Sequence, residues 1–254
     1  MFRRFLPLLL VLVFVPNVSA GELKPETLAA WTAYIVAKHN QPLKLSPMQR
    51  NEAQSGQIIV WPVAEVNPIK VPHGLIHDWA GVVFIPGVTM TEALATARGG
   101  FFNPSIVRGK ELASTGMIDH YSILTVTHTA FTTAAIDGEY ETLYLQIDPT
   151  HWYSISQSTK LQAVENFGTT DEQLDPPDQG PGYVWRLYTI TSFEEADGGV
   201  YIELEAVGLS RDVPFLFRWL VNPIISHLPE DSLRATLAAT RTAIQKRELP
   251  HPIP

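Results

Sequence analysis

The sequence predicts an α+β fold in which a curved antiparallel sheet of about six to seven strands surrounds a long C-terminal helix. Strand-like segments follow one another from Ile106 onward and are joined by turn signals such as Asp148-Pro149 and Asp197-Gly198-Gly199. Good helix formers run from Glu230 to Lys246. A curved sheet must cover its concave face, and this helix is the nearby element long enough to do so. We therefore expect the sheet to grip the helix, with a cavity between them.

The first twenty residues differ from the rest of the chain. Arg3 and Arg4 precede a largely apolar run from Phe5 to Val15, and Val18-Ser19-Ala20 resembles a cleavage site. This three-part pattern predicts a secretory signal peptide, residues 1–20, cleaved after Ala20; the alternative is an uncleaved anchor. The run is too short for a comfortable membrane span, and no Cys follows it for a lipoprotein anchor. We expect a secreted or periplasmic protein with no stable membrane span after cleavage.

The composition indicates an ordinary globular chain and narrows its partners. The 254 residues are 45% hydrophobic and 17% charged. Without residues 1–20, which hold two arginines and no acid, 16 basic and 26 acidic residues remain, a net charge of −10. Nucleic acid and anionic membranes attract basic faces, so neither is an expected partner. The absence of cysteine excludes disulfides, thiolate chemistry and Cys-ligated metals.

We find neither an internal repeat nor a second composition regime, which favours one main domain over residues 57–247. A helical and irregular segment, residues 21–56, precedes it, and a tail, residues 248–254, follows. Helix is expected over Glu22–His39, with residues 40–56 irregular. Next come a strand over Gln57–Ala64, at an edge because of Pro62, and another over Leu75–Ile85. Thr89 or Thr91 then caps a short helix ending at Arg98, with Glu92 near its start.

Six strands are expected in the second half of the chain. They cover Ile106–Ala113, Met117–Thr129, Tyr140–Asp148, Trp152–Glu165, Gly182–Glu194 and Gly199–Leu209. Asp137-Gly138 is a further turn signal in this region. The acidic, Pro- and Gly-rich segment 166–181 is expected to form a surface loop.

Two helical segments are expected after the last strand. The first begins near Pro214, is ended or kinked by Pro223, and is followed by a short connection closed by Pro229. On the final helix one stripe holds Leu233, Leu237, Thr240 and Ile244, flanked by Thr236 and Arg241. A threonine in mid-stripe with many alanines around it leaves room for a ligand. The same pattern also fits an ordinary amphipathic helix whose threonine bonds back to the preceding turn.

An ensemble of short motifs over about residues 57–246 resembles the START-like or SRPBCC helix-grip superfamily, which includes polyketide cyclase-like and birch-pollen-allergen-like proteins. More narrowly it resembles a group of uncharacterised bacterial secreted proteins within that superfamily. The motifs are Gly74–Trp79, Phe84–Gly87, Trp152–Ser158, Gly182–Leu187, Gly198–Tyr201 with Glu203, Leu209–Arg211 with Pro214, Ser232-Leu233 and Thr240-Arg241. The resemblance implies binding of lipids, sterols or other apolar molecules in the cavity, and in some members cyclisation or hydrolysis there.

Eight residues are candidates for lining that cavity: Trp152, Tyr183, Trp185, Arg211, Leu237, Thr240, Arg241 and Ile244. Tyr183, Trp185 and Phe193 share one strand face by alternation, and Trp152 shares a face with Ser154, Ser156 and Ser158. Rings mixed with hydroxyls suit an apolar pocket that orients its ligand, and they equally suit a plain core. Arg211 and Arg241 either bind a ligand carboxylate or phosphate, or pair with a nearby acid.

Catalytic and metal sites are not expected. The sequence has no G-x-S-x-G elbow, phosphate loop or H-E-x-x-H motif. His73 and His77 flank a Pro-Gly turn, and His120 and His128 lie about 27 Å apart along one strand at roughly 3.4 Å per residue. Glu203 and Glu205 are expected on the solvent face; on the concave face one of them would be a buried acid of raised pKa.

We therefore predict non-catalytic binding of an apolar or amphipathic, lipid-like small molecule, without metal or cofactor. Two alternatives remain. A cyclase- or hydrolase-type enzyme would need a His, Asp or Glu projecting into the same cavity. A filled-core interaction protein would leave too little space for a ligand of about ten heavy atoms.

Overall fold

The computed structural model describes residues 22–39, 43–98, 103–128, 133–179, 184–212 and 218–246, with the side chains of the last helix described from Pro229 onward. The expected signal peptide, Tyr183, Pro214 and the tail 248–254 lie outside these residues. Within them, no helix combines the length and apolar character that a membrane crossing requires.

In the part of the chain that the structure describes, ten strands form one antiparallel sheet, more than the six to seven expected. Eight of them follow the order β1-β3-β10-β9-β7-β6-β5-β4, while β2 pairs with β3 and β8 with β7. The strands are β1 Ile59–Pro62, β2 Ile69–Val71, β3 Gly74–Pro86, β4 Ile106–Ser114, β5 Ile118–His128, β6 Thr133–Asp148, β7 His151–Glu165, β8 Gln173–Leu174, β9 Val184–Ala196 and β10 Gly199–Arg211. The expected number was too low partly because β2 and β8 span only three and two residues, too few to show alternation.

The β9–β10 turn forms as predicted, whereas Asp137-Gly138 does not form a turn. Asp197 and Gly198 have φ of 54° and 77°, the positive values that a tight hairpin turn requires. Asp137 and Gly138 instead lie inside β6, which begins at Thr133. A Cβ at Gly138 would come within 2.7 Å of the Leu161 side chain, so glycine here leaves room for that side chain.

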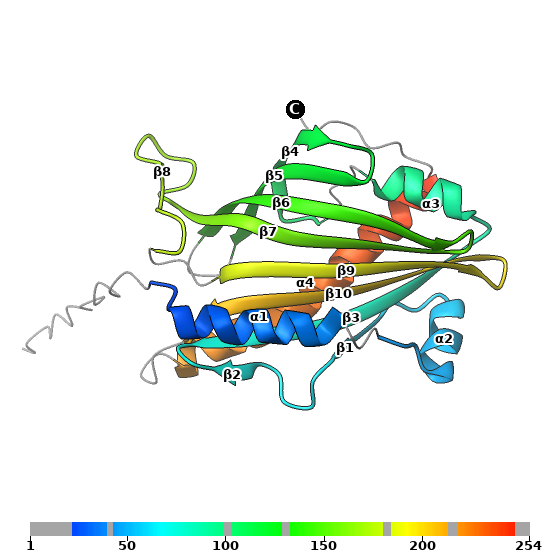
Figure 1. Cartoon of the computed structure of the whole chain (residues 1–254), viewed down its shortest axis with the longest axis horizontal. Helices are drawn as coiled ribbons and strands as arrows, with labels where there is room; N and C mark the ends of the chain where they lie inside the picture. The colour runs from blue at the N-terminus through cyan, green and yellow to red at the C-terminus, as the bar shows by residue number, and fades with distance from the viewer. Residues whose placement is uncertain are drawn as a thin grey trace, which may run out of the picture.

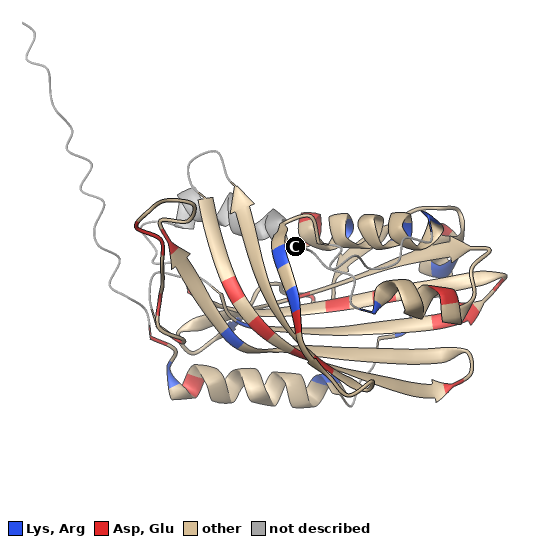
Figure 2. Ribbon diagram, turned by 90° about the horizontal axis from the view of Figure 1, so that it is seen from above, with Lys and Arg blue, Asp and Glu red and all other residues tan. Residues whose placement is uncertain are grey.

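Helices cover both faces of the sheet. Figure 1 shows α1 (Pro25–His39) in front of the sheet and α4 (Arg218–Lys246) behind it, and Figure 2 shows the sheet between them, curving toward α4. We call the α4 side the inner face and the α1 side the outer face. The sequence predicted a helix close to α1 but did not predict that it covers the sheet.

The inner-face core lies between α4 and the centre of the sheet. Leu233, Leu237 and Ile244 pack against β3, β9 and β10, including Val83, Phe193 and Ile202. The predicted stripe of the C-terminal helix therefore faces the sheet. The helix runs without interruption through Pro223 and Pro229, so the prediction of two segments was wrong. A proline removes one intrahelical hydrogen bond and need not end a helix that tertiary packing holds.

The outer-face core lies under α1. Trp31 packs there with Ile76, Tyr188, Val207 and Leu209, which come from β3, β9 and β10. Strands β3 and β10 are therefore buried on both faces, and β3 accordingly carries an unbroken apolar run from Ala80 to Ile85.

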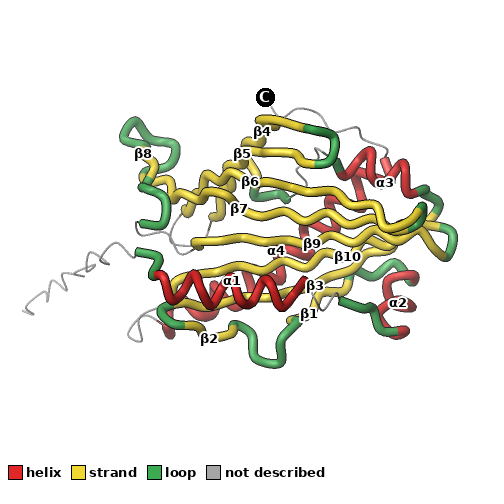
Figure 3. The backbone as a smooth tube through the Cα atoms, in the orientation of Figure 1, coloured by secondary structure: helices red, strands yellow, loops and turns green. Residues whose placement is uncertain are grey.

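Two short helices lie at the end of the sheet that carries the β9–β10 turn (Figure 3). Thr89, one of the two threonines expected to cap this helix, forms a capping box with Glu92 at α3 (Met90–Ala97). Ser46 and Gln49 form another at α2 (Pro47–Gln54), inside the segment expected to be irregular. The S-x-x-Q signal was present, but α2 is too polar to show a helical stripe.

Candidate functional site

The inner face carries four of the eight residues predicted to line a cavity. Leu237 and Ile244 are each 1% exposed, and both belong to the core between α4 and the sheet. Thr240 is also buried, on the same helix. Trp152 on β7 is partly buried and packs against this core. These four residues therefore lie at the contact between α4 and the sheet.

A strip of hydroxyl side chains continues along the inner face from Trp152. Trp152 pairs with Phe193, Ser154 with Thr191, and Ser156 with Thr189, so alternate residues of β7 and β9 share this face. The four hydroxyl residues, Ser154, Ser156, Thr189 and Thr191, are half-buried. Thr142 on β6 donates a 2.9 Å hydrogen bond to Ser156. The middle of the inner face is thus polar but uncharged, beside an aromatic and apolar core.

The other predicted residues lie elsewhere. Trp185 packs with Trp31 in the outer-face core, and does not share the inner face with Phe193 as expected. The β9–β10 register shifts here: Leu209 pairs with Arg186 and Ser210 with Val184, so Trp185 is the bulged residue between them.

The two arginines lie apart from these four residues. Arg211 is buried at the end of β10, opposite Gly74. Arg241 donates a 2.8 Å hydrogen bond to the carbonyl oxygen of Gly56. Arg234, two turns earlier on the same face of α4, donates a 2.7 Å hydrogen bond to the Ile58 carbonyl oxygen. These two bonds attach α4 to the segment before β1, an anchoring role that the sequence did not predict.

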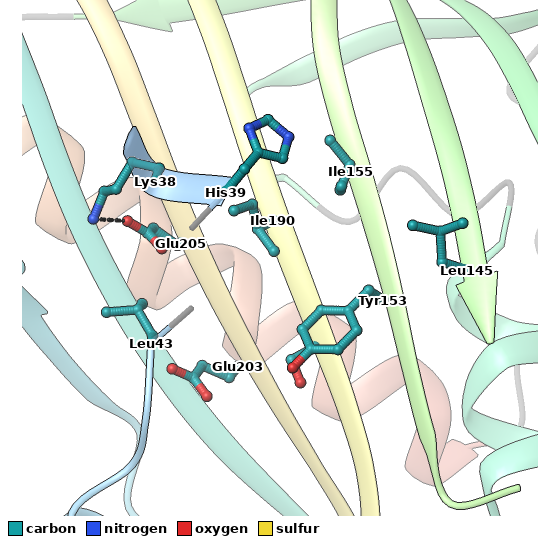
Figure 4. Close-up of a pocket in the computed structure, with 10 residues that line it drawn as sticks. Lys38, His39, Leu43, Leu145, Tyr153, Ile155, Ile190, Glu203 and Glu205 are labelled. Carbon is teal, nitrogen blue, oxygen red and sulfur yellow. Dashed lines mark ion pairs between the residues drawn. The ribbon is translucent and has the colours of Figure 1, made fainter. Parts of the chain in front are cut away.

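A pocket of about 270 Å³ lies on the outer face, where the sequence predicted none. Figure 4 shows Glu203 in its lower part, with Leu43 on one side in this view and Tyr153 on the other. The last turn of α1, Leu43 and four strands supply the lining: Lys38, His39, Leu43, Leu145, Tyr153, Ile155, Ile190, Ser192, Glu203 and Glu205. Apolar side chains therefore form most of its walls, and two carboxyl groups from β10 lie on one side.

A buried ionic cluster joins α1 to the sheet beside this pocket. The Lys38 ammonium lies 2.8 Å from Asp78 Oδ2 and also contacts Glu205. The Tyr34 hydroxyl donates a 2.5 Å hydrogen bond to Asp78 Oδ2. Asp78 is fully buried and Glu205 is 3% exposed. The expectation that Glu205 faces solvent was therefore wrong, because α1 covers this face of β10.

Burial governs the protonation of these groups. Burial tends to lower the pKa of Lys38, but its bonds to Asp78 and Glu205 outweigh this and raise the pKa overall. Burial, followed by the charge of Asp78, raises the pKa of Glu205, and Lys38 partly offsets the effect. Burial, followed by the charge of Glu194, raises the pKa of Glu203 to about 7 although Arg50 acts in the opposite direction. Glu203 is thus half-buried and readily protonated near neutral pH, contrary to its expected solvent position.

The structure also brings together a histidine and a serine that the sequence did not pair. His77 Nε2 lies 2.9 Å from Ser210 Oγ, and both residues are buried. Burial lowers the pKa of His77, so its ring is neutral at pH 7. Because both side chains are enclosed by protein, we interpret the pair as a satisfied structural contact. Among the described residues, no group of three or more His, Asp or Glu side chains is arranged to hold a metal ion.

No protein-family model matches the sequence, and no curated protein matches it. Solved structures of similar fold include a STAR-related lipid transfer protein from Xanthomonas axonopodis (TM-score 0.40, 15% identity, 72% of this chain and 98% of that chain covered). Human STARD10 is a further example (TM-score 0.45, 11% identity, 93% of this chain and 88% of that chain covered). Another is the Zhui aromatase/cyclase from a Streptomyces species (TM-score 0.41, 11% identity, 68% of this chain and 95% of that chain covered). At these identities the likeness concerns the fold alone.

Proposed function

We propose that this protein binds an apolar or amphipathic small molecule, lipid-like in character, between the inner face of the sheet and α4, without turning it over. The half-buried hydroxyl strip of Ser154, Ser156, Thr189 and Thr191 carries this proposal. A ligand pocket typically combines apolar walls with a few polar groups that fix orientation. Trp152 and the α4 core supply the apolar part, and the strip supplies hydrogen-bond donors and acceptors for a hydroxyl, ester or ketone.

The acid–base groups of the inner face support binding over turnover. His77 is enclosed and bonded to Ser210. Asp119 is 2% exposed and accepts hydrogen bonds from Ser114 at 2.5 Å and Tyr121 at 2.9 Å. A general acid or base must reach the proton that it transfers. Since both groups already have protein partners, we assign them structural roles.

Native mass spectrometry of the protein purified from an exporting host tests the binding proposal. We expect a mass excess of a few hundred daltons that disappears on denaturation, and a rise in Tm with the corresponding fatty acid, phospholipid or sterol. A ligand-free mass together with no Tm shift by any of these three classes would overturn the proposal and favour the filled-core interaction protein.

Neighbouring residues of β7 provide a matched pair of variants. Ser156→Trp places a large ring on the inner face and should abolish ligand retention, while Gln157→Trp places the same ring on the exposed outer side and should not. Thr189→Leu, a smaller change on the same strip, should weaken retention in a protein that still folds. Equal retention by all three variants would contradict binding at the strip.

We further propose that residues 1–20 direct export and are removed after Ala20, and that residues 57–247 form the ligand-binding domain. The tripartite pattern of charge, apolar run and small residues supports the first part. N-terminal sequencing of the exported protein should begin at Gly21. An N-terminus at Met1 in a membrane fraction would instead indicate an uncleaved anchor.

A further inference from the structure

We propose that the outer-face pocket is a second binding site, and that it takes a small amphipathic amine whose ammonium group pairs with Glu203. This site is separated from the inner face by the sheet itself, since Glu203 lies on β10 and alternates with Ile202 and Leu204 of the inner-face core. The inference therefore does not depend on the ligand proposed for the inner face.

The walls of the pocket suit a short hydrocarbon chain. Leu43, Leu145, Ile155 and Ile190 line it together with the ring of Tyr153. Its volume of about 270 Å³ lies just below the roughly 300–1,000 Å³ of clefts that hold drug-sized ligands. A ligand of about nine non-hydrogen atoms therefore fits, whereas a phospholipid or sterol does not. This size distinguishes the outer pocket from a lipid-sized cavity.

The charges at the pocket favour a cation. Lys38 lines it, but its ammonium is already bound between Asp78 and Glu205, so one positive charge faces two carboxylates. Glu203 adds a third carboxyl group on the same face of β10. Arg50, the cation that lowers the pKa of Glu203, forms ion pairs with Glu194 at 2.5 Å and Asp197 at 3.3 Å. An anionic ligand would meet excess negative charge, and a cationic one would offset it.

Glu203 also has an unused acceptor. Its Oε1 is buried and has no hydrogen-bond partner among the described residues. A buried carboxyl oxygen without a donor is costly, and a bound ammonium supplies up to three donors. The raised pKa of Glu203 agrees with a carboxyl group that lacks its cation. Ser192, on the neighbouring β9 and directly opposite Glu203, offers a hydroxyl to the same ammonium.

Isothermal titration calorimetry with n-octylamine, n-octanol and octanoate at pH 7 tests the site. The three probes share a chain length and differ in head group, and the amine is protonated at this pH because its pKa is close to that of lysine. We expect the amine to bind with a Kd below about 1 mM, about ten-fold or more tighter than octanol, and octanoate not to bind. Octanol binding as tightly as the amine, or no amine binding at 1 mM, would overturn the proposal.

Variants locate the binding. Glu203→Gln should weaken octylamine binding about ten- to hundred-fold, the loss typical of one hydrogen bond to a charged group. Glu139→Gln removes an exposed carboxylate from the same sheet and should leave binding unchanged. Ser192→Leu fills the pocket without touching the ionic cluster and should also abolish binding, which tests the site even if Glu203→Gln folds poorly.

Failure here is distinguishable from failure of the inner-face proposal. Ser156→Trp should block the inner-face ligand and leave octylamine binding intact, and Ser192→Leu should do the reverse. Loss of octylamine binding in Ser156→Trp would place the amine on the inner face and contradict the outer site.

Discussion

The ammonium of Lys38, in the last turn of α1, lies 2.8 Å from Asp78 Oδ2 on β3 and also contacts Glu205 on β10. One positive charge therefore lies against two carboxylate groups, at the place where α1 covers strands that are distant from it in the sequence. Tyr34 donates a hydrogen bond to the Asp78 carboxylate. The Asn67 side chain donates to the backbone carbonyl oxygen of Asp78 and accepts from its backbone N–H. The outer face thus depends on polar contacts as well as on the Trp31 core.

Lys38→Met should destabilise the protein by about 3–5 kcal/mol, because it leaves Asp78 and Glu205 buried without a cation. Urea unfolding at pH 7 measures the change. Lys160→Met, which breaks an exposed pair with Glu139, should cost no more than about 1 kcal/mol. The double variant Lys38→Met, Glu205→Gln should recover part of the loss. Equal effects of the two single lysine variants would show that the buried cluster contributes little.

Stability should fall as pH rises through the range in which Glu203 ionises. Its folded pKa is raised from 4.5 to about 7, so the folded state holds this proton more tightly than the unfolded state. The stability that protonated Glu203 contributes is fully present below pH about 4.5, and it is lost as the pH rises toward and beyond 7. At about 1.4 kcal/mol per pKa unit, wild type should lose up to about 3 kcal/mol relative to Glu203→Gln between pH 4.5 and 8. Parallel urea-unfolding profiles for the two proteins would contradict the raised pKa.

Two strand glycines should respond in opposite ways to alanine. A Cβ at Gly138 would lie 2.7 Å from Leu161 and from the Tyr140 ring, so Gly138→Ala should cost about 1–3 kcal/mol. At Gly208 the nearest atom within reach is Leu187 Cδ2 at 3.5 Å, an ordinary contact, so Gly208→Ala should be neutral or slightly stabilising. Thermal unfolding of both variants checks the pair. A tolerated Gly138→Ala would mean that the Leu161 and Tyr140 side chains can move aside.

Arg241→Ala distinguishes an anchor from a ligand contact. Its bond to the Gly56 carbonyl predicts a loss of about 1 kcal/mol in the free energy of unfolding, with ligand retention unchanged. Arg234→Ala, which loses the bond to Ile58, should behave in the same way. Loss of ligand from the Arg241 variant alone, at unchanged stability, would instead support the ligand-binding role considered from the sequence.

Local signals determined much of the fold in advance. The cap of α3, the Asp197-Gly198 turn and the strand nature of β10 each depend on residues within a few positions of one another, and each forms where it was predicted, with Thr89 as the cap of the two threonines considered. The Leu233–Leu237–Ile244 spacing likewise identified the face of α4 that contacts the sheet. For these elements, the sequence contains the interaction that decides the structure.

Tertiary contacts decided the rest. Alternation placed Glu203 and Glu205 on one face of β10 but could not tell that α1 covers that face, so the outer pocket and the buried cluster were missed. Trp185 changed faces because of a bulge set by its pairing with β10, and Asp137-Gly138 became strand because Leu161 and Tyr140 pack against it. The sequence alone determined which residues share a strand or helix face. Elements distant in the chain decided which of these faces are buried and which charges lie beside them. Burial and pKa could not be predicted from local sequence because both depend on the tertiary packing.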